Sequence, residues 1–231
     1  MTHFKTKHLN HGKLTLYFIS GQAADEKIFE NLSLPSNVNT RHVHWIEPLP
    51  KETLSHYCQR LCDQIDTSGS FVLIGVSFGG IVSLELNKII HPKEVIIISS
   101  IATKNELTPI FKLFNLVKLQ KIVPPQIYKW YTPVLNWYFG ATTQREKQLL
   151  RLYAKSASKN YMKWAVNEIL NWKNETRASN LFHIHGTRDR IFPHQKTHAD
   201  IKIAGGSHLM VHNRSEEISN ILSDRINSIR L

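Results

Sequence analysis

The sequence has few cysteines, few acidic residues and no long apolar run. Only two cysteines occur in 231 residues, and Cys58 and Cys62 lie four residues apart, so on a helix they share one face. This excludes a disulfide scaffold, and we expect a packed, reduced pair rather than a disulfide or a metal site. No apolar run approaches the roughly 20 residues of a membrane-spanning helix, so the sequence predicts no such helix.

An apolar segment is also missing near the amino terminus. Residues 1–8 read Met-Thr-His-Phe-Lys-Thr-Lys-His, which is not the apolar core of a secretory signal. We therefore expect a cytoplasmic protein. The composition is that of a globular chain, 42% hydrophobic and 20% charged. Its length suffices for one α/β domain with a full core and an insertion.

Acidic residues are outnumbered by basic ones, and the imbalance is local. The formal net charge is +11, and residues 104–177 hold thirteen Lys and Arg against four Asp and Glu. Such a segment suits a solvated surface, the steering of an anionic substrate such as an acyl thioester of a phosphorylated carrier, or contact with an anionic membrane surface. No nucleic-acid recognition motif accompanies it, so we expect no specific nucleic-acid partner.

Buried-strand patterns alternate with amphipathic helices, which predicts a mostly parallel sheet covered by helices, an α/β fold. The expected strands are 14–19, 41–46, 71–76, 94–98, 181–185 and 199–203, with an edge strand at 3–9. The expected helices are 53–65, one following Ser77, and one from about 215 to the end. Residues 103–178 show helical periodicity, no convincing strand and four of the five tryptophans. We therefore expect a core of 1–102 and 179–231, with a helical insertion at 103–178.

One turn organises the chain: residues 75–79, Gly-Val-Ser-Phe-Gly, lie between an apolar strand and a helix. The glycines let strand and helix backbones approach closely, and Ser77 sits at the positive end of the helix. A phosphate could also bind such a turn. However, Ser77 occupies the position where a dinucleotide-binding turn needs a glycine, so that the pyrophosphate can approach the backbone. The Gly-Lys-Ser/Thr sequence of a P-loop is also absent. The turn therefore favours a nucleophile elbow with Ser77 at its tip.

A serine nucleophile needs a histidine to take its proton and a carboxylate to orient that histidine. Functional groups of open α/β sheets gather at the carboxyl ends of strands. Asp189 and His208 follow the last two predicted strands through short loops. Two other histidine pairs are weaker candidates. His194 and His198 have no His-Glu-x-x-His pattern, so we expect no metal, and for 183–185 we expect one packed and one polar strand face.

In this order and context, the chain resembles the α/β-hydrolase superfamily. The resemblance rests on Gly-Val-Ser-Phe-Gly, on Gly-Thr-Arg-Asp-Arg-Ile-Phe-Pro and Gly-Gly-Ser-His-Leu-Met after late strands, and on a helical insertion where such enzymes carry a cap. It implies that Ser77 is the nucleophile, His208 the general base and acid, and Asp189 the residue that orients His208. Some relatives place the acid after the strand that follows the elbow helix, but residues 99–101 read Ser-Ser-Ile.

The resemblance also implies an oxyanion hole made of backbone N–H groups. We expect them from Phe78 and Gln22, with Ala23 as the alternative, because Ser20 replaces the histidine that often precedes Gly21 in the family.

A substrate pocket is the last feature that we expect near Ser77. Its proposed lining residues are Gly21, Trp130, Trp137 and Leu209, although most aromatic residues of the insertion should pack the cap.

The expected activity is hydrolysis of a small-molecule carboxylic ester through an acyl-enzyme, without a metal or organic cofactor. A thioesterase, or a hydrolase of amide or carbon–carbon bonds, remains an alternative, because the same triad serves them all. A hydrolase-like protein that senses a ligand is a further alternative.

Overall fold

The computed structural model describes residues 13–108, 111, 133–156 and 158–229. In this part of the chain, one sheet of parallel strands has the order β2-β1-β3-β4-β5-β6. The strands are β1 (Thr15–Ile19), β2 (Asn39–Val43), β3 (Phe71–Val76), β4 (Glu94–Ile98), β5 (Leu181–Gly186) and β6 (Ile201–Ile203). The edge strand expected at 3–9 lies outside the described residues.

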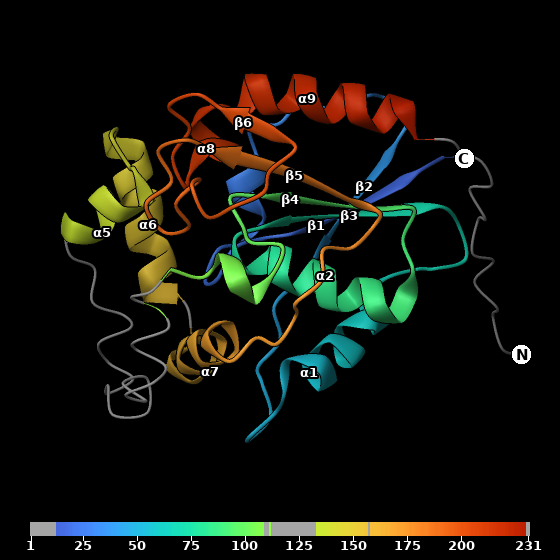
Figure 1. Ribbon diagram of the computed structural model, residues 1–231, viewed down its shortest axis with the longest axis horizontal. Helices are drawn as coiled ribbons and strands as arrows, with labels where there is room; N and C mark the ends of the chain where they lie inside the picture. Colours follow the sequence, from blue (N-terminus) through green and yellow to red (C-terminus); the bar gives the residue numbers. More distant parts are fainter. Residues whose placement is uncertain (1–12, 109–110, 112–132, 157, 230–231) are drawn as a thin grey trace, which may run out of the picture.

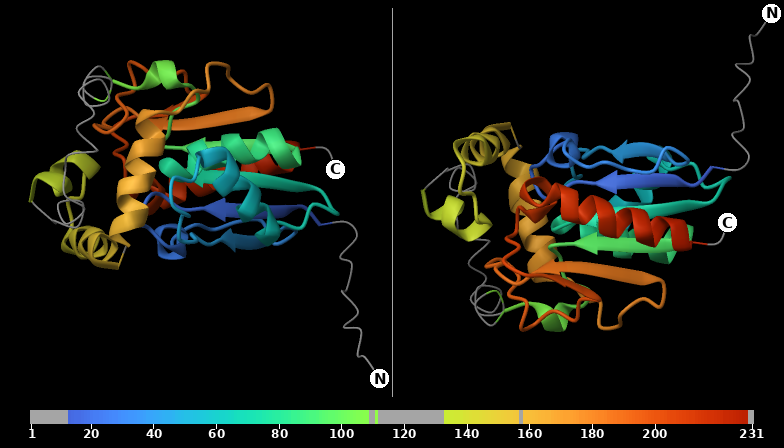
Figure 2. Two further views of the ribbon diagram at one scale, coloured as in Figure 1. Left: turned by 90° about the horizontal axis from the view of Figure 1, so that it is seen from below. Right: turned by 90° about the horizontal axis from the view of Figure 1, so that it is seen from above.

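Helices cover both faces of the sheet and its carboxyl end. The α-helices are α1 (Leu54–Leu61), α2 (Phe78–Ile90), α5 (Pro133–Phe139), α6 (Gln144–Ser156), α7 (Lys159–Leu170), α8 (Met210–Asn213) and α9 (Ser215–Ser228). Short 3-10 helices are η1 (Glu26–Phe29), η2 (Cys62–Gln64) and η3 (Lys104–Glu106). Helices α1 and α2 lie on one face and α9 on the other (Figure 1). Helices α5, α6 and α7 lie beyond the strand ends toward which the arrows point (Figure 2).

Alternate residues of the central strands feed two separate hydrophobic cores. In β1, Tyr17 and Ile19 pack with α1 and α2, whereas Leu16 and Phe18 pack with α9. This alternation is what a strand buried on both faces requires, because successive side chains point to opposite sides of the sheet. Because every pair of neighbouring strands is parallel, the carboxyl ends of all the strands lie at one edge of the sheet.

The predicted fold class is confirmed, and the strand boundaries differ most at β2. That strand begins at Asn39, whose N–H donates to the carbonyl of Leu14 at 2.9 Å. It ends at Val43 because the following N–H groups turn away from the sheet. The N–H of His44 donates to the side chain of Gln64 at 2.8 Å, and that of Ile46 donates to the hydroxyl of Tyr57 at 3.1 Å. Side chains of α1 and η2 thus take the place of the backbone hydrogen bonds that would continue the strand.

The insertion predicted at 103–178 contains α5, α6 and α7, and its described residues contain no strand. Its division from the core as a separate unit stays a prediction, as does the role of its basic residues, several of which fall at 112–132, outside the described ranges. None of the helices in the described ranges combines the length and hydropathy that a membrane crossing requires. Cys58 and Cys62 are both free thiols, and Cys58 is buried.

Candidate active site

Ser77 occupies a strained turn between β3 and α2. Its φ of 54° and ψ of −121° lie in a region that non-glycine residues rarely adopt. Hydrogen bonds to its own backbone hold it there. Its N–H donates to the carbonyl of Ile98 at 3.0 Å, and its carbonyl accepts from the N–H of Gly80 at 2.9 Å and from the hydroxyl of Ser100 at 2.7 Å. Ser100 is a positioning residue that the sequence did not reveal.

The glycines of the turn allow backbone contacts that a side chain would prevent. A Cβ added to Gly75 would lie 2.3 Å from the carbonyl oxygen of Gly79. A Cβ added to Gly79 would lie 2.2 Å from the carbonyl oxygen of Ile19 and 2.3 Å from that of Ser20. The start of α2 is therefore pressed against the end of β1, which sets the height of Ser77 above the sheet.

Replacing Gly79 by alanine is expected to lower the free energy of unfolding by about 1–3 kcal/mol or more, because neighbouring backbone must move. This loss should exceed the gain of about 1 kcal/mol that alanine brings to a helix. Gly69→Ala is the matched control, since nothing lies within 4 Å of an added Cβ there. It should leave stability unchanged or raise it by less than about 1 kcal/mol. Urea unfolding measures both, and equal midpoints for the two variants would contradict the packing argument.

The three residues predicted to act together are brought together at the carboxyl end of the sheet. The Nε2 atom of His208 lies 2.9 Å from Ser77 Oγ, and its Nδ1 atom lies 2.8 Å from Asp189 Oδ2. Both Asp189 and His208 are buried, while Ser77 is half-buried. Because a carboxylate only accepts, Nδ1 carries the proton and Nε2 is left free to accept the serine proton.

The loop after β5 fixes the carboxylate of Asp189. Its Oδ1 atom accepts hydrogen bonds from the N–H groups of Ile191 at 2.8 Å and Phe192 at 2.9 Å. The second oxygen, Oδ2, is thereby directed at His208. The carbonyl of Phe192 in turn accepts from His185 Nε2 at 2.6 Å, and His185 Nε2 also lies 3.7 Å from Asp189 Oδ2. His185 thus fixes the position of the loop whose N–H groups orient Asp189.

His185 does not act alone, because His183 lies behind it on the same face of β5. Both imidazoles are fully buried, and His183 Nε2 lies 3.2 Å from His185 Nδ1. Burial lowers the pKa of both, which favours their neutral forms. The expected split into one packed and one polar face was wrong, because Ile184 on the other face of β5 is buried as well. Residues two apart on a strand share one face, and here that face is interior.

Aromatic rings and the end of α5 enclose the imidazole of His208. The rings of Phe139 and Phe192 contact it edge-on, with centroids 5.3 and 5.8 Å away. The N–H of Leu209 donates to the carbonyl of Phe139 at 3.3 Å, and Arg190 Nη1 donates to the carbonyl of Trp137 at 2.7 Å. Helix α5 is therefore attached to both loops that carry the acid and the histidine.

The loop after β1 lies beside Ser77. A Cβ on Gly21 would be 3.5 Å from the Cβ of Ser77. The loop turns at Ala23, which has a φ of 65°, and it closes with a bond from the N–H of Ala24 to the carbonyl of Gly21 at 3.0 Å. The side chain of Gln22 donates to the carbonyl of Met162 in α7 at 3.1 Å. Phe78, whose N–H is the other expected donor, is the first residue of α2.

Of the remaining residues predicted to line a pocket, the two described ones differ in burial, and their role as pocket residues stays a prediction. The side chain of Trp137 is 57% exposed, and the guanidinium of Arg190 lies over its ring at 4.3 Å. Leu209 is buried in the hydrophobic core on the α9 side of the sheet. Trp130 lies outside the described residues.

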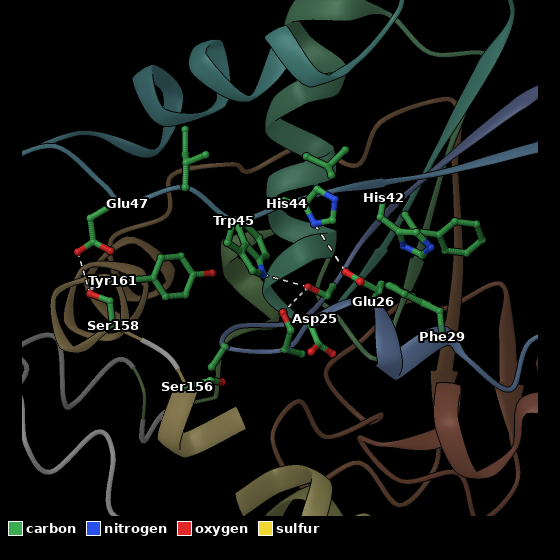
Figure 3. Close-up of a pocket in the computed structure, with 16 residues that line it drawn as sticks. Asp25, Glu26, Phe29, His42, His44, Trp45, Glu47, Ser156, Ser158 and Tyr161 are labelled. Atoms are coloured by element: carbon green, nitrogen blue, oxygen red, sulfur yellow. Dashed lines mark hydrogen bonds and ion pairs between the residues drawn. The ribbon is translucent and has the colours of Figure 1, made fainter. Parts of the chain in front are cut away.

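A cavity of about 370 Å³ lies between the loop after β1, the end of β2, the end of α6 and the start of α7 (Figure 3). Ser20, Ala23 and Ala24 border it, but Ser77, Asp189 and His208 do not. The sequence did not predict this cavity. Among the described residues, no group of three or more His, Cys, Asp or Glu side chains could hold a metal ion.

No protein-family model and no curated protein sequence matches the chain. Several solved structures are similar to it. An esterase from Thermogutta terrifontis has a TM-score of 0.65 at 12% identity, covering 94% of this chain and 91% of that one. A lipase-esterase related protein from Clostridium acetobutylicum has a TM-score of 0.62 at 14% identity, covering 94% of both chains. An epoxide hydrolase from Bacillus megaterium has a TM-score of 0.62 at 13% identity, also covering 94% of both. At identities this low, structural similarity is evidence for the fold alone. These similarities show that the chain has the α/β-hydrolase fold.

Proposed function

We propose that the chain is a serine hydrolase that cleaves a small-molecule carboxylic ester through an acyl-enzyme on Ser77. The observation that supports this most is the continuous line of hydrogen bonds from Ser77 through His208 to Asp189, at 2.9 and 2.8 Å. A serine hydroxyl alone is a weak nucleophile, and such a line activates it. The shared fold with an esterase and a lipase-esterase related protein favours the same class by analogy.

In the first half of the proposed reaction, Ser77 Oγ attacks the ester carbonyl carbon while its proton passes to His208 Nε2. Asp189 stabilises the imidazolium that forms. The carbonyl oxygen becomes an oxyanion, for which we propose the backbone N–H groups of Phe78 and Gln22, with Ala23 as the alternative to Gln22. His208 then donates its proton to the departing alcohol, and the acyl group remains on Ser77.

Water completes the cycle by attacking the acyl carbon. His208 takes a proton from this water and returns one to Ser77 Oγ as the carboxylic acid leaves. The sum is one ester plus one water giving one acid and one alcohol. The proposed reaction therefore needs no metal or organic cofactor.

A panel of nitrophenyl esters with two-, four- and eight-carbon acyl groups, each paired with its matched thioester, tests the proposal. Where deacylation is slower than acylation, we expect a burst of about one nitrophenol per protein molecule before steady turnover, because the acyl-enzyme then accumulates. A thioester cleaved a hundredfold faster than its ester would make the protein a thioesterase. Saturable ligand binding without turnover of any compound would instead indicate a ligand-sensing protein.

A further inference from the structure

The cavity between the loop after β1, the end of β2 and the start of α7 has an aromatic interior and an acidic rim (Figure 3). We propose that it is a binding site for a small organic ammonium ion. Its volume of about 370 Å³ lies within the range of small-molecule sites. The proposal goes beyond hydrolysis at Ser77, because no residue of the Ser77, His208 and Asp189 line borders the cavity.

The charge of the cavity is opposite to that of the molecule. The chain carries a net charge of +11, yet the cavity is bordered by three carboxylates, two histidines and no lysine or arginine: Asp25, Glu26, Glu47, His42 and His44. Burial lowers the pKa of His42, which favours its neutral form. Glu47 is exposed at the edge of the cavity and accepts a hydrogen bond from Ser158 Oγ at 2.8 Å, which fixes the position of its carboxylate. Glu26 lies 3.6 Å from His44 Nδ1. A concave surface lined by one sign of charge concentrates ions of the other sign, here cations.

Tyr161 supplies a second, independent observation that points to a ligand. Its side chain is 4% exposed, and its hydroxyl has no hydrogen-bond partner among the described residues. The hydroxyl points into the cavity toward Trp45 (Figure 3). A buried polar group without a partner is costly, and a ligand or water in the cavity would satisfy it. Burial also raises the pKa of Tyr161, so the hydroxyl keeps its proton.

The aromatic walls are fixed before any ligand arrives. The indole N–H of Trp45 donates to Ser20 Oγ at 3.0 Å and to the carbonyl of Gly21 at 3.2 Å, and its ring stacks on Phe78 at 5.5 Å. The ring of Tyr161 lies 5.5 Å from that of Trp45. Two aromatic rings in a cavity bordered by carboxylates attract an alkylammonium ion through cation–π and Coulomb interactions, while its alkyl groups fill the apolar space.

The probes are choline and its uncharged isostere 3,3-dimethylbutan-1-ol, titrated into the full-length protein and followed by calorimetry. We expect choline to bind at least about tenfold more tightly than the neutral alcohol, and its affinity to fall as salt rises. Equal affinity for the two probes, or no saturable binding of choline, would overturn the proposal.

Three variants locate the site. Glu47→Gln keeps an acceptor for Ser158 but removes the charge, and Tyr161→Phe removes only the hydroxyl; each should weaken choline binding about three- to tenfold. The control Glu216→Gln removes an exposed carboxylate at the start of α9, away from the cavity, and should leave affinity unchanged. Loss of affinity in the control equal to that in Glu47→Gln would mean that choline responds only to net charge.

Choline and an ester substrate assayed together distinguish two sources of the ligand. Competitive inhibition of nitrophenyl ester hydrolysis would show that the ammonium group belongs to the natural ester. Binding that leaves KM unchanged would show a separate effector site. Ester turnover without choline binding would overturn this proposal and leave the proposed hydrolase function standing.

Discussion

Replacing Ser77 by alanine is expected to lower kcat/KM for a nitrophenyl ester by about a million-fold, to the level of a catalyst without a nucleophile. The substitution removes only Oγ, the atom that lies 2.9 Å from His208 Nε2. The bonds that hold the turn use the backbone N–H and carbonyl of residue 77, so they remain in the variant. Fold and stability should therefore stay close to those of the native protein.

The matched control is Ser55→Ala, which removes an exposed hydroxyl from α1. Its kcat/KM should equal that of the native protein. Steady-state assays of both variants, with unfolding curves to verify the fold, measure the contrast. If Ser77→Ala kept activity within tenfold of the native value, the nucleophile would be another residue.

Replacing Asp189 by asparagine is expected to lower kcat by about 10⁴-fold with little change in the fold. The geometry determines how the new amide must lie. Two N–H donors, from Ile191 and Phe192, face one end of the side chain, so the amide oxygen takes that end. The amide NH₂ then faces His208 Nδ1. That nitrogen must become an acceptor, which puts the proton on Nε2, where it cannot accept from Ser77.

Asp224→Asn is the control for this prediction, because it changes an exposed carboxylate of α9 in the same way. Its kcat should be unchanged. A value for Asp189→Asn within tenfold of the native kcat would remove Asp189 from the proposed mechanism and direct attention to another partner of His208.

The sequence predicted the elements around Ser77 well, because their signals are local. Residues 71–80 combine an apolar run, a glycine turn and a helix in one stretch, and such a pattern allows few structures. Asp189 and His208 could be placed because parallel strands bring the loops that follow them to one edge of the sheet. Their hydrogen-bond distances are consistent with that reasoning.

Features that depend on distant contacts were not predictable in the same way. The cavity forms where Ser158 meets Glu47, residues 111 positions apart, and no periodicity in either segment indicates that contact. His183 is fully buried against His185, whereas in the sequence a histidine between apolar residues fits either strand face. The exposure of Trp137 depends on where α5 docks.

Labelling with a fluorophosphonate, followed by peptide mass spectrometry, tests the central claim most directly, because the reagent reacts with activated serines. We predict a single phosphonylated residue, Ser77, in the native protein and no label in Ser77→Ala. A label on a different serine, a label that persists in Ser77→Ala, or a native protein that stays unlabelled would contradict the assignment of Ser77, His208 and Asp189 as the catalytic residues.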